Sequence, residues 1–220
     1  MTELLSELET SPIGPLSDDE AAEALELLTE LGEDQPDLAA FAGRESVARD
    51  FICAAFSLSP WLSDTARVAP DALALAIFTP LETLLADVEA EMRGAWRDKD
   101  GPVSESTLMA TLRCAKRCAA MALALHDLAR LTDARATTAG LTKLADAGLA
   151  GAFDHLLRSA HDSGKLKLAD PENPSENSGV VVLGMGKHGA GELNFSSDID
   201  IVVFFEPEAE IAVDAEEATD

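Results

Sequence analysis

The chain has 220 residues, and its 41 acidic against 16 basic side chains give a formal net charge of −25 at pH 7. A surface this acidic does not attract nucleic acid or an anionic membrane without specific contacts. The N-terminus lacks a signal-peptide pattern, no apolar run reaches the roughly 20 residues of a membrane span, and three cysteines are too few for a disulfide scaffold. We therefore expect no nucleic-acid partner, no membrane contact and a cytoplasmic location.

Amphipathic helices are predicted over much of the first 169 residues, because apolar side chains recur there at helical spacing. Asp18 and Asp19 are the expected N-cap of the first helix, and Gly32 is expected just after its end. Later helices are predicted from residue 45 to the residue before Pro60, over 71–78, from Pro80 to about 96, over 104–131 and over 137–160. Such helices favour an antiparallel bundle over residues 1–169.

Two clusters on the helix predicted over 104–131 have alternative interpretations. Cys114, Cys118 and His126 lie at helical spacing, but a fourth ligand and the spacing of a zinc site are missing, so core packing is favoured. The one dense basic cluster consists of Arg113, Lys116 and Arg117. Its side chains either pair with acids of neighbouring helices or face an anionic ligand such as phosphate, and the sequence leaves both alternatives open.

The composition changes at residues 170–179, DPENPSENSG, where prolines and polar turn-formers exclude helix and central strand. Continuous apolar runs follow, which are typical of strands buried on both faces. We therefore expect an α+β fold, with a helical domain over residues 1–169, a linker loop over 170–179 and a second domain over 180–220. The acidic segment 206–220 is expected to be a solvated or disordered tail.

Two acids in the stretch VVVLGMGKHGAGELNFSSDIDIVVFF, residues 180–205, indicate a metal site. Asp198 and Asp200 are predicted to begin the second strand. Side chains two residues apart share a face of a strand, so both carboxylates would project in the same direction. Two close carboxylates repel each other unless a divalent cation lies between them.

The glycine-rich turn between the two strands is typical of phosphate binding. It contains Gly184, Gly186, Gly189 and Gly191, which permit close approach of a ligand to backbone N–H groups. Lys187 is well placed to meet a phosphate, and His188 is more typical of a contact residue than of a catalyst. A dinucleotide-binding turn is disfavoured, because Gly191 and Ser197 are too close in sequence for the long helix that such a turn opens.

These residues resemble a known superfamily. Gly186-Lys187, Gly191 and Ser197-Asp198-Ile199-Asp200 stand at the spacing of polymerase-beta-type nucleotidyltransferases, with lysine where serine is usual. The whole stretch looks like the first of two such motifs in the glutamine synthetase adenylyltransferase/adenylyl-removing enzymes, and NFSS favours the first copy. The helical segments CAAFSLSPWL and LRCAKRCAAMALALHDLARL are also similar to segments of that family.

The resemblance implies a fold and a mechanism. The second domain would be the start of a nucleotidyltransferase fold, in which Asp198 and Asp200 are catalytic and bind Mg²⁺. The residues that would bind the nucleotide, ATP or ADP, are Gly184, Gly186, Lys187, Gly189, Gly191 and Ser197. This half would use phosphate to remove AMP from a tyrosine of glutamine synthetase and release ADP, whereas the other half transfers AMP from ATP. The implied partners are glutamine synthetase and the PII signalling protein.

The family also needs a third carboxylate on a later strand, for which Glu208, Glu210 and Asp214 are poor candidates. We therefore expect the chain to be a truncated, N-terminal piece of such an enzyme, without appreciable removing activity by itself. Two alternatives remain. One is another polymerase-beta-type nucleotidyltransferase, acting on a small molecule or on tRNA, which the acidic surface disfavours. The other is a non-catalytic helical interaction domain.

Overall fold

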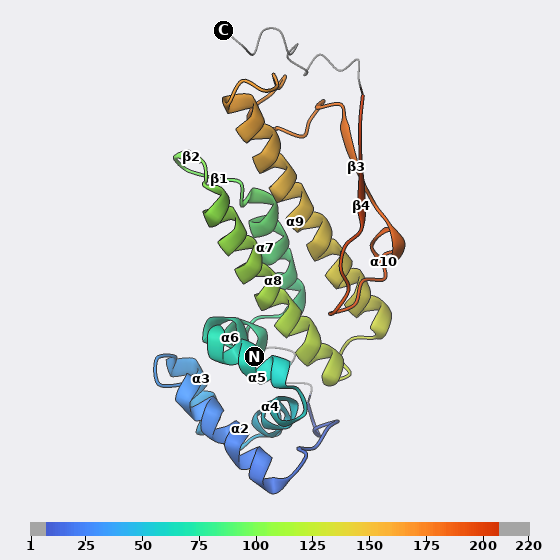
Figure 1. The fold of residues 1–220 in the computed structure, drawn as a ribbon. Helices are drawn as coiled ribbons and strands as arrows, with labels where there is room; N and C mark the ends of the chain where they lie inside the picture. The colour runs from blue at the N-terminus through green and yellow to red at the C-terminus, as the bar shows by residue number, and fades with distance from the viewer. Residues whose placement is uncertain (1–7, 207–220) are drawn as a thin grey trace. The chain divides into compact units, whose positions relative to one another are not determined.

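The computed structural model describes residues 8–206, most of which are helical (Figure 1). The helices are α2 (Asp18–Leu31), α3 (Pro36–Ala42), α4 (Val47–Leu58), α5 (Pro60–Val68), α6 (Pro70–Phe78), α7 (Leu81–Gly94), α8 (Glu105–Leu128), α9 (Ala134–Asp162) and α10 (Gly186–Gly189). The strands are β1 (Arg97–Asp98), β2 (Gly101–Pro102), β3 (Val180–Gly184) and β4 (Ile201–Phe205). The expected α+β class is confirmed: a helical bundle is followed by the start of a nucleotidyltransferase fold.

The elements pack into two compact units. The first unit comprises Met1–Val88 and Ala115–Gly140, and the second comprises Glu89–Cys114 and Leu141–Asp220. Helices α7, α8 and α9 therefore each contribute residues to both units. The division predicted at residues 170–179 rests on composition alone, and it stays a prediction.

The core of the first unit is built from the apolar faces of its helices. Helix α2 packs against α3, α4 and α5, and α5 also packs against α4 and α6. Phe51, Leu73 and Leu125 are fully buried there, and Phe41 and Phe78 meet edge to face with ring centroids 6.0 Å apart. Each fully buried side chain of this size contributes about 1.5–3 kcal/mol to folding through the hydrophobic effect.

Serine hydroxyl groups begin three helices of the first unit. The hydroxyl oxygens of Ser17, Ser46 and Ser59 accept hydrogen bonds from backbone N–H groups in the first turns of α2, α4 and α5. The expectation that Asp18 and Asp19 form the cap of α2 is therefore wrong by one residue. Both acids lie in the first turn, where they still favour the positive end of the helix dipole.

Most of the predicted helices are confirmed with small shifts at their ends. Helices α4, α6, α8 and α9 match the ranges expected from apolar spacing, and α7 ends at Gly94, before Trp96. Helices α3 and α5 were not anticipated. Both are short and begin with proline, which also marks turns and helix ends, so their sequences offered little to distinguish them from connecting segments. No helix among the described residues is both long enough and apolar enough to cross a membrane.

The loop after α9 is held by charged and polar contacts within the second unit. Arg158 of α9 lies 3.1 Å from the Glu172 carboxylate and donates to the Pro171 carbonyl, and Arg97 contacts the other oxygen of Glu172 at 3.0 Å. The Ser175 N–H donates to the Asp154 carboxylate at 3.1 Å. Residues 171–175 are therefore fastened to α9 despite their turn-rich composition.

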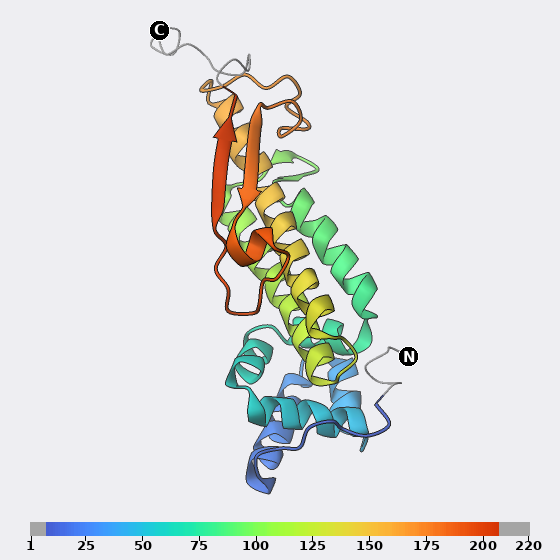
Figure 2. The same cartoon turned by 90° about the vertical axis from the view of Figure 1, so that its right-hand side faces the viewer.

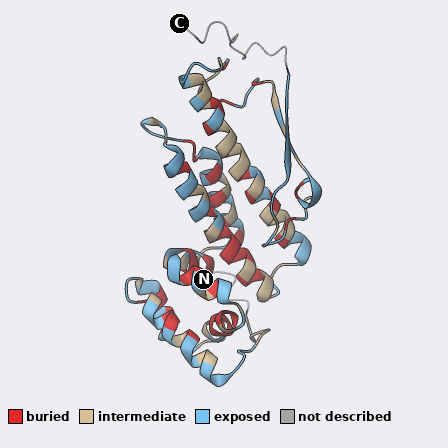
Figure 3. Ribbon diagram, viewed as in Figure 1, coloured by how far each residue is buried: buried red, intermediate tan, exposed pale blue. Residues whose placement is uncertain are grey.

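Strands β3 and β4 form an antiparallel hairpin beside α9 (Figure 2). The register pairs Val180 with Phe205 and Gly184 with Ile201. Strand β3 alternates between half-buried and exposed residues, whereas β4 is exposed throughout, as the blue ribbon in Figure 3 shows. The expectation that both strands are buried on both faces is wrong for the described residues, because their sheet has two strands and no layer covers its outer face.

Candidate nucleotide site

The glycine-rich turn is compact because backbone atoms approach each other where side chains would not fit. A Cβ atom at Gly189 would lie 2.3 Å from the Gly184 carbonyl oxygen, well inside van der Waals contact. Gly186 and Gly191 have φ angles of +55° and +73°, in the left-handed region that favours glycine. These glycines thus fold the chain from the end of β3 into the single turn of α10 and out again.

The turn leaves backbone donors available. In the described part of the chain, the N–H groups of Gly186, Lys187 and His188 have no hydrogen-bond acceptor, as is usual for the first turn of a helix. The Lys187 side chain is exposed and forms no ion pair with a described residue. Successive free N–H groups beside a lysine form a suitable surface for phosphate oxygens.

The two acids precede β4 instead of lying on it. The strand begins at Ile201, so the prediction that Asp198 and Asp200 start it is wrong by a few residues. The pairing nevertheless continues to Asp200, whose carbonyl oxygen accepts a 2.8 Å hydrogen bond from the Met185 N–H. The Asp200 carboxylate lies 3.9 Å from the position of a Cβ atom at Gly186. The backbone therefore brings one of the acids directly beside the turn.

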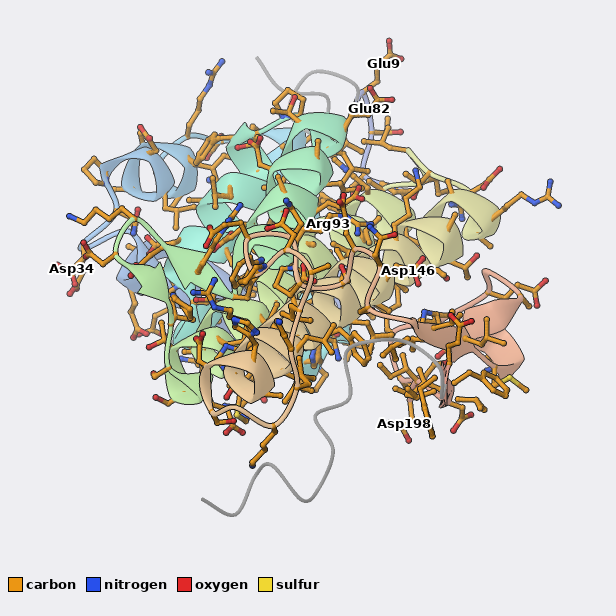
Figure 4. All side chains as sticks on the ribbon, turned by 90° about the horizontal axis from the view of Figure 1, so that it is seen from above. Glu9, Asp34, Glu82, Arg93, Asp146 and Asp198 are labelled. Carbon is orange, nitrogen blue, oxygen red and sulfur yellow. The ribbon has the colours of Figure 1, made fainter. Side chains whose placement is uncertain are left out.

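Asp198 and Asp200 are both exposed, and neither carboxylate has a hydrogen bond or ion pair with another residue in the range 8–206. Figure 4 shows Asp198 at the outer edge of the hairpin segment. Carboxylate oxygens are the ligands that Mg²⁺ prefers, and this ion is commonly held by one or two carboxylates together with substrate phosphates. The pair beside a phosphate-binding turn fits that arrangement.

A third ligand is not supplied by the described residues. Within residues 8–206 no group of three or more His, Cys, Asp or Glu side chains is arranged to hold a metal. Glu208, Glu210 and Asp214 lie outside the described residues. The visible site is therefore a pair of carboxylates.

Ser197 has a structural contact that the sequence did not predict. Its hydroxyl donates a 2.8 Å hydrogen bond to the Asn194 side-chain oxygen, which also accepts hydrogen bonds from the N–H and hydroxyl of Ser196. These contacts form a tight turn immediately before Asp198. A role for Ser197 in nucleotide binding stays a prediction.

His188 is buried, with 5% of its surface exposed, although it belongs to the turn. Its Nε2 lies 2.8 Å from a carboxylate oxygen of Asp146 on α9. One helical turn earlier, the hydroxyl oxygen of Thr142 accepts a hydrogen bond from the Leu193 N–H at 3.3 Å. Sequence reasoning missed Asp146 and Thr142, because nothing in the pattern of α9 distinguishes them from other polar residues of an amphipathic helix.

Within residues 8–206, Cys114, Cys118 and His126 are not part of a group arranged to hold a metal. Cys118 and His126 are buried, which agrees with the core-packing interpretation, but Cys114 is exposed. The basic cluster consists of Arg113, Lys116 and Arg117. None of these side chains forms an ion pair with a described residue, so the first of the two alternatives, pairing with acids of neighbouring helices, is not observed among the described residues.

Comparison with known proteins gives a consistent family. A family model described as Glutamate-ammonia ligase adenylyltransferase matches residues 50–220. The chain is 49% identical over 217 residues to the bifunctional glutamine synthetase adenylyltransferase/adenylyl-removing enzyme of Agrobacterium fabrum, a match that covers 98% of this chain and 22% of that enzyme. The enzyme of the same name from Rhizobium meliloti is 44% identical over 216 residues, covering 97% of this chain and 22% of the enzyme.

A third relative with the same name, from Mesorhizobium japonicum, is 47% identical over 183 residues, which cover 83% of this chain and 18% of that enzyme. The chain therefore spans about a fifth of the length of these curated relatives. No solved structure matches the chain.

Proposed function

Because this chain belongs to the glutamate–ammonia ligase adenylyltransferase family, we propose that its glycine turn and paired acids form part of a metal-dependent nucleotidyl site. The site handles the adenylyl group that the family attaches to, or removes from, glutamine synthetase. Glutamine synthetase is then the protein substrate, and ATP or ADP is the nucleotide. A PII signalling protein as a second partner and a cytoplasmic location belong to the same proposal.

The placement of Asp200 is the observation that carries the proposal. Its backbone is hydrogen-bonded to Met185, at the entrance of the glycine turn, and its carboxylate lies beside Gly186. Among the described residues, the turn has N–H groups without an acceptor and the exposed Lys187, and the Asp200 carboxylate lies beside it. Such an arrangement suits a phosphate chain that bridges protein donors and a metal ion.

Asp198 and Asp200 would bind Mg²⁺ through their carboxylate oxygens. When bound, the ion neutralises phosphate charge and helps to align the phosphoryl group for in-line attack. The chain's own contribution is positional: the turn N–H groups and Lys187 would hold phosphate oxygens, and the Met185–Asp200 hydrogen bond holds the segment that carries the two acids against the turn. Orientation and electrostatic complementarity supply most of the rate enhancement in phosphoryl transfer.

We assign the site to the removing reaction, in which phosphate attacks the adenylyl-tyrosine and ADP leaves. The sequence Asn194-Phe195-Ser196-Ser197 resembles the first of the two motif copies in the family, and this resemblance supports the assignment. The names of the curated relatives include both adenylyltransferase and adenylyl-removing activities. Within residues 8–206, no third His, Cys, Asp or Glu joins the two carboxylates in a group arranged to hold a metal. We therefore expect the 220-residue chain to bind nucleotide without appreciable turnover.

The proposal is tested by titrating the chain with ADP in the presence and absence of Mg²⁺, using isothermal calorimetry. We expect binding that needs the metal and is lost in the Asp198→Asn, Asp200→Asn double variant, since amides do not replace the negative charge that attracts the ion. The matched control is Asp87→Asn, which changes an exposed carboxylate on α7 with no ion pair to a described residue. Equal ADP affinity with and without Mg²⁺ would contradict the metal-dependent site.

The substrate assignment has its own measurement. Adenylylated glutamine synthetase is immobilised, and binding of the chain is compared with binding to the same enzyme lacking AMP. Preferential binding to the adenylylated form is expected. Phosphate-dependent release of ADP by the 220-residue chain would contradict the expectation that two carboxylates do not sustain turnover.

A further inference from the structure

We propose that Asp146 on α9 and His188 in the glycine turn are positioning residues that latch the nucleotide-binding turn onto the helix. The inference rests on the proposed function for the identity of the ligand, but the latch itself is defined by geometry. Neither residue needs to touch the nucleotide. Their role is to hold the free N–H groups of the turn in the conformation that meets phosphate oxygens.

The latch has one buried and one accessible partner. The His188 side chain has 3% of its surface exposed and the Asp146 side chain 55%, and the 2.8 Å contact joins Nε2 of the ring to a carboxylate oxygen. An ionised carboxylate only accepts hydrogen bonds, so Nε2 carries the proton and donates it. Hydrogen bonds to charged acceptors are stronger than neutral ones, particularly when one partner is shielded from water.

The imidazole ring also acts as a wedge inside the turn. A Cβ atom at Gly184 would lie 3.0 Å from Nδ1 and 3.1 Å from Cγ of His188, so the ring packs closely against the end of β3. Nδ1 is buried and has no partner among the described residues. The ring therefore connects β3 on one side with α9 on the other, through packing and one hydrogen bond.

A second contact makes the attachment two-point. Thr142 accepts a hydrogen bond from the Leu193 N–H, and Leu193 is itself buried. Thr142 and Asp146 are four residues apart, so they lie on the same face of α9, one turn from each other. One contact holds the middle of the turn and the other holds the segment that leaves it. Helix α9 thus serves as a rigid base for the turn.

The latch predicts a local effect that differs from general destabilisation. Replacing Asp146 by alanine removes the acceptor and leaves the buried ring nitrogen without a partner, although Asp146 itself is exposed enough for the chain to fold normally. The turn then opens more often. We expect the amides of Gly189, Ala190 and Gly191 to exchange with deuterium about tenfold faster, which is the usual scale for losing one such hydrogen bond.

The experiment compares Asp146→Ala with two reference variants of the whole 220-residue chain. Asp146→Asn retains a side-chain oxygen that accepts the same hydrogen bond and should restore most of the protection. Asp154→Asn lies on the same helix, contacts the loop residue Ser175 and not the turn, and should leave the turn amides unchanged. Exchange is measured by mass spectrometry without nucleotide, and affinity for Mg²⁺·ADP is measured by calorimetry.

The two readouts separate the latch from the proposed function. Unchanged exchange at residues 189–191 in Asp146→Ala overturns the latch, whatever the nucleotide does, and so does equal acceleration across the whole chain. If the unaltered chain binds Mg²⁺·ADP, Asp146→Ala should bind it about three to ten times more weakly, because fewer molecules hold a competent turn. Unchanged affinity would overturn the positioning role. A chain that binds no Mg²⁺·ADP would overturn the proposed function and leave the exchange test decisive for the latch.

Discussion

His126 is a polar residue placed where the sequence pattern favours an apolar one. It lies in the core of the first unit with 1% of its surface exposed, and neither ring nitrogen has a hydrogen-bond partner among the described residues. Burial lowers the pKa of His126 below its ordinary value of 6.5, because the charged form would lose its hydration. Burial therefore favours the neutral form of the imidazole, and no described residue hydrogen-bonds to the ring.

The burial of His126 predicts that the free energy of unfolding decreases at low pH. Below pH 6.5 the unfolded chain binds a proton at His126 that the folded chain does not, so stability is lost as the pH falls through that value. The loss approaches about 1.4 kcal/mol per pH unit until the lowered pKa is reached. His126→Leu removes it. We expect the stability advantage of the variant over the unaltered chain to increase as the pH falls from 7.5 to 5.5.

Urea unfolding at pH 7.5, 6.5 and 5.5 tests the prediction. Carboxylates that titrate in this range do so in both proteins, so the difference between the two curves isolates His126. A constant difference across the three pH values would show that the imidazole binds a proton equally in the folded and unfolded chains.

At the scale of single elements, α9 depends on close approach to α7 within the second unit. A Cβ atom at Gly151 would lie 2.1 Å from the carbonyl oxygen of Met92, a distance at which the backbone of α7 must move. Gly148, one turn earlier, would place its Cβ at ordinary contact distance, 3.9 Å from the end of the flexible Met92 side chain. A side chain at Gly151 would therefore clash with the backbone of α7, whereas a methyl group at Gly148 would fit.

We therefore expect the substitution of glycine by alanine to change the stability in opposite directions at the two positions. Gly148→Ala should be neutral or stabilising by about 0.5–1 kcal/mol, the usual benefit of alanine over glycine inside a helix. Gly151→Ala should destabilise by about 1–3 kcal/mol, because the added methyl group overpacks the contact. Thermal unfolding followed by circular dichroism measures both. Equal effects of the two substitutions would contradict the close approach of α7 to Gly151.

The elements also show which features a sequence can predict. Helices α4 and α9 are predictable because apolar residues recur over several turns, and the glycine turn is predictable because its glycines permit backbone conformations closed to other residues. The start of β4 was misplaced, since the backbone pairing that ends at Asp200 leaves no trace in residue types. The contact between Asp146 and His188 could not be predicted from the sequence, because it joins residues 42 positions apart through packing of helix and turn.

At the scale of the whole molecule, the outer face of the hairpin is an exposed apolar surface. Directly paired residues share a face of the sheet, so Val181, Leu183, Val202 and Phe204 lie together on the outer side. All four are exposed, Phe204 by 54%. Contiguous apolar surface of this kind is uncommon on a chain with a net charge of −25, whose acidic side chains otherwise keep it hydrated.

We expect this face to bind the dye ANS strongly. The Leu183→Thr, Phe204→Thr double variant should reduce the fluorescence by more than half, because threonine removes most of the apolar area and keeps a branched side chain suited to strands. The control is Leu156→Gln, which replaces a single exposed leucine on α9. Equal dye binding by the double variant and the unaltered chain would place the apolar surface elsewhere.

The attachment of the turn to α9 also has an evolutionary consequence. A carboxylate at position 146 is useful only while position 188 carries a hydrogen-bond donor, although the two stand 42 residues apart and in segments of different composition. Relatives that replace the imidazole by an aliphatic side chain lose the hydrogen bond that gives the acid its positioning role. We therefore expect the residue types at positions 146 and 188 to covary among members of the family.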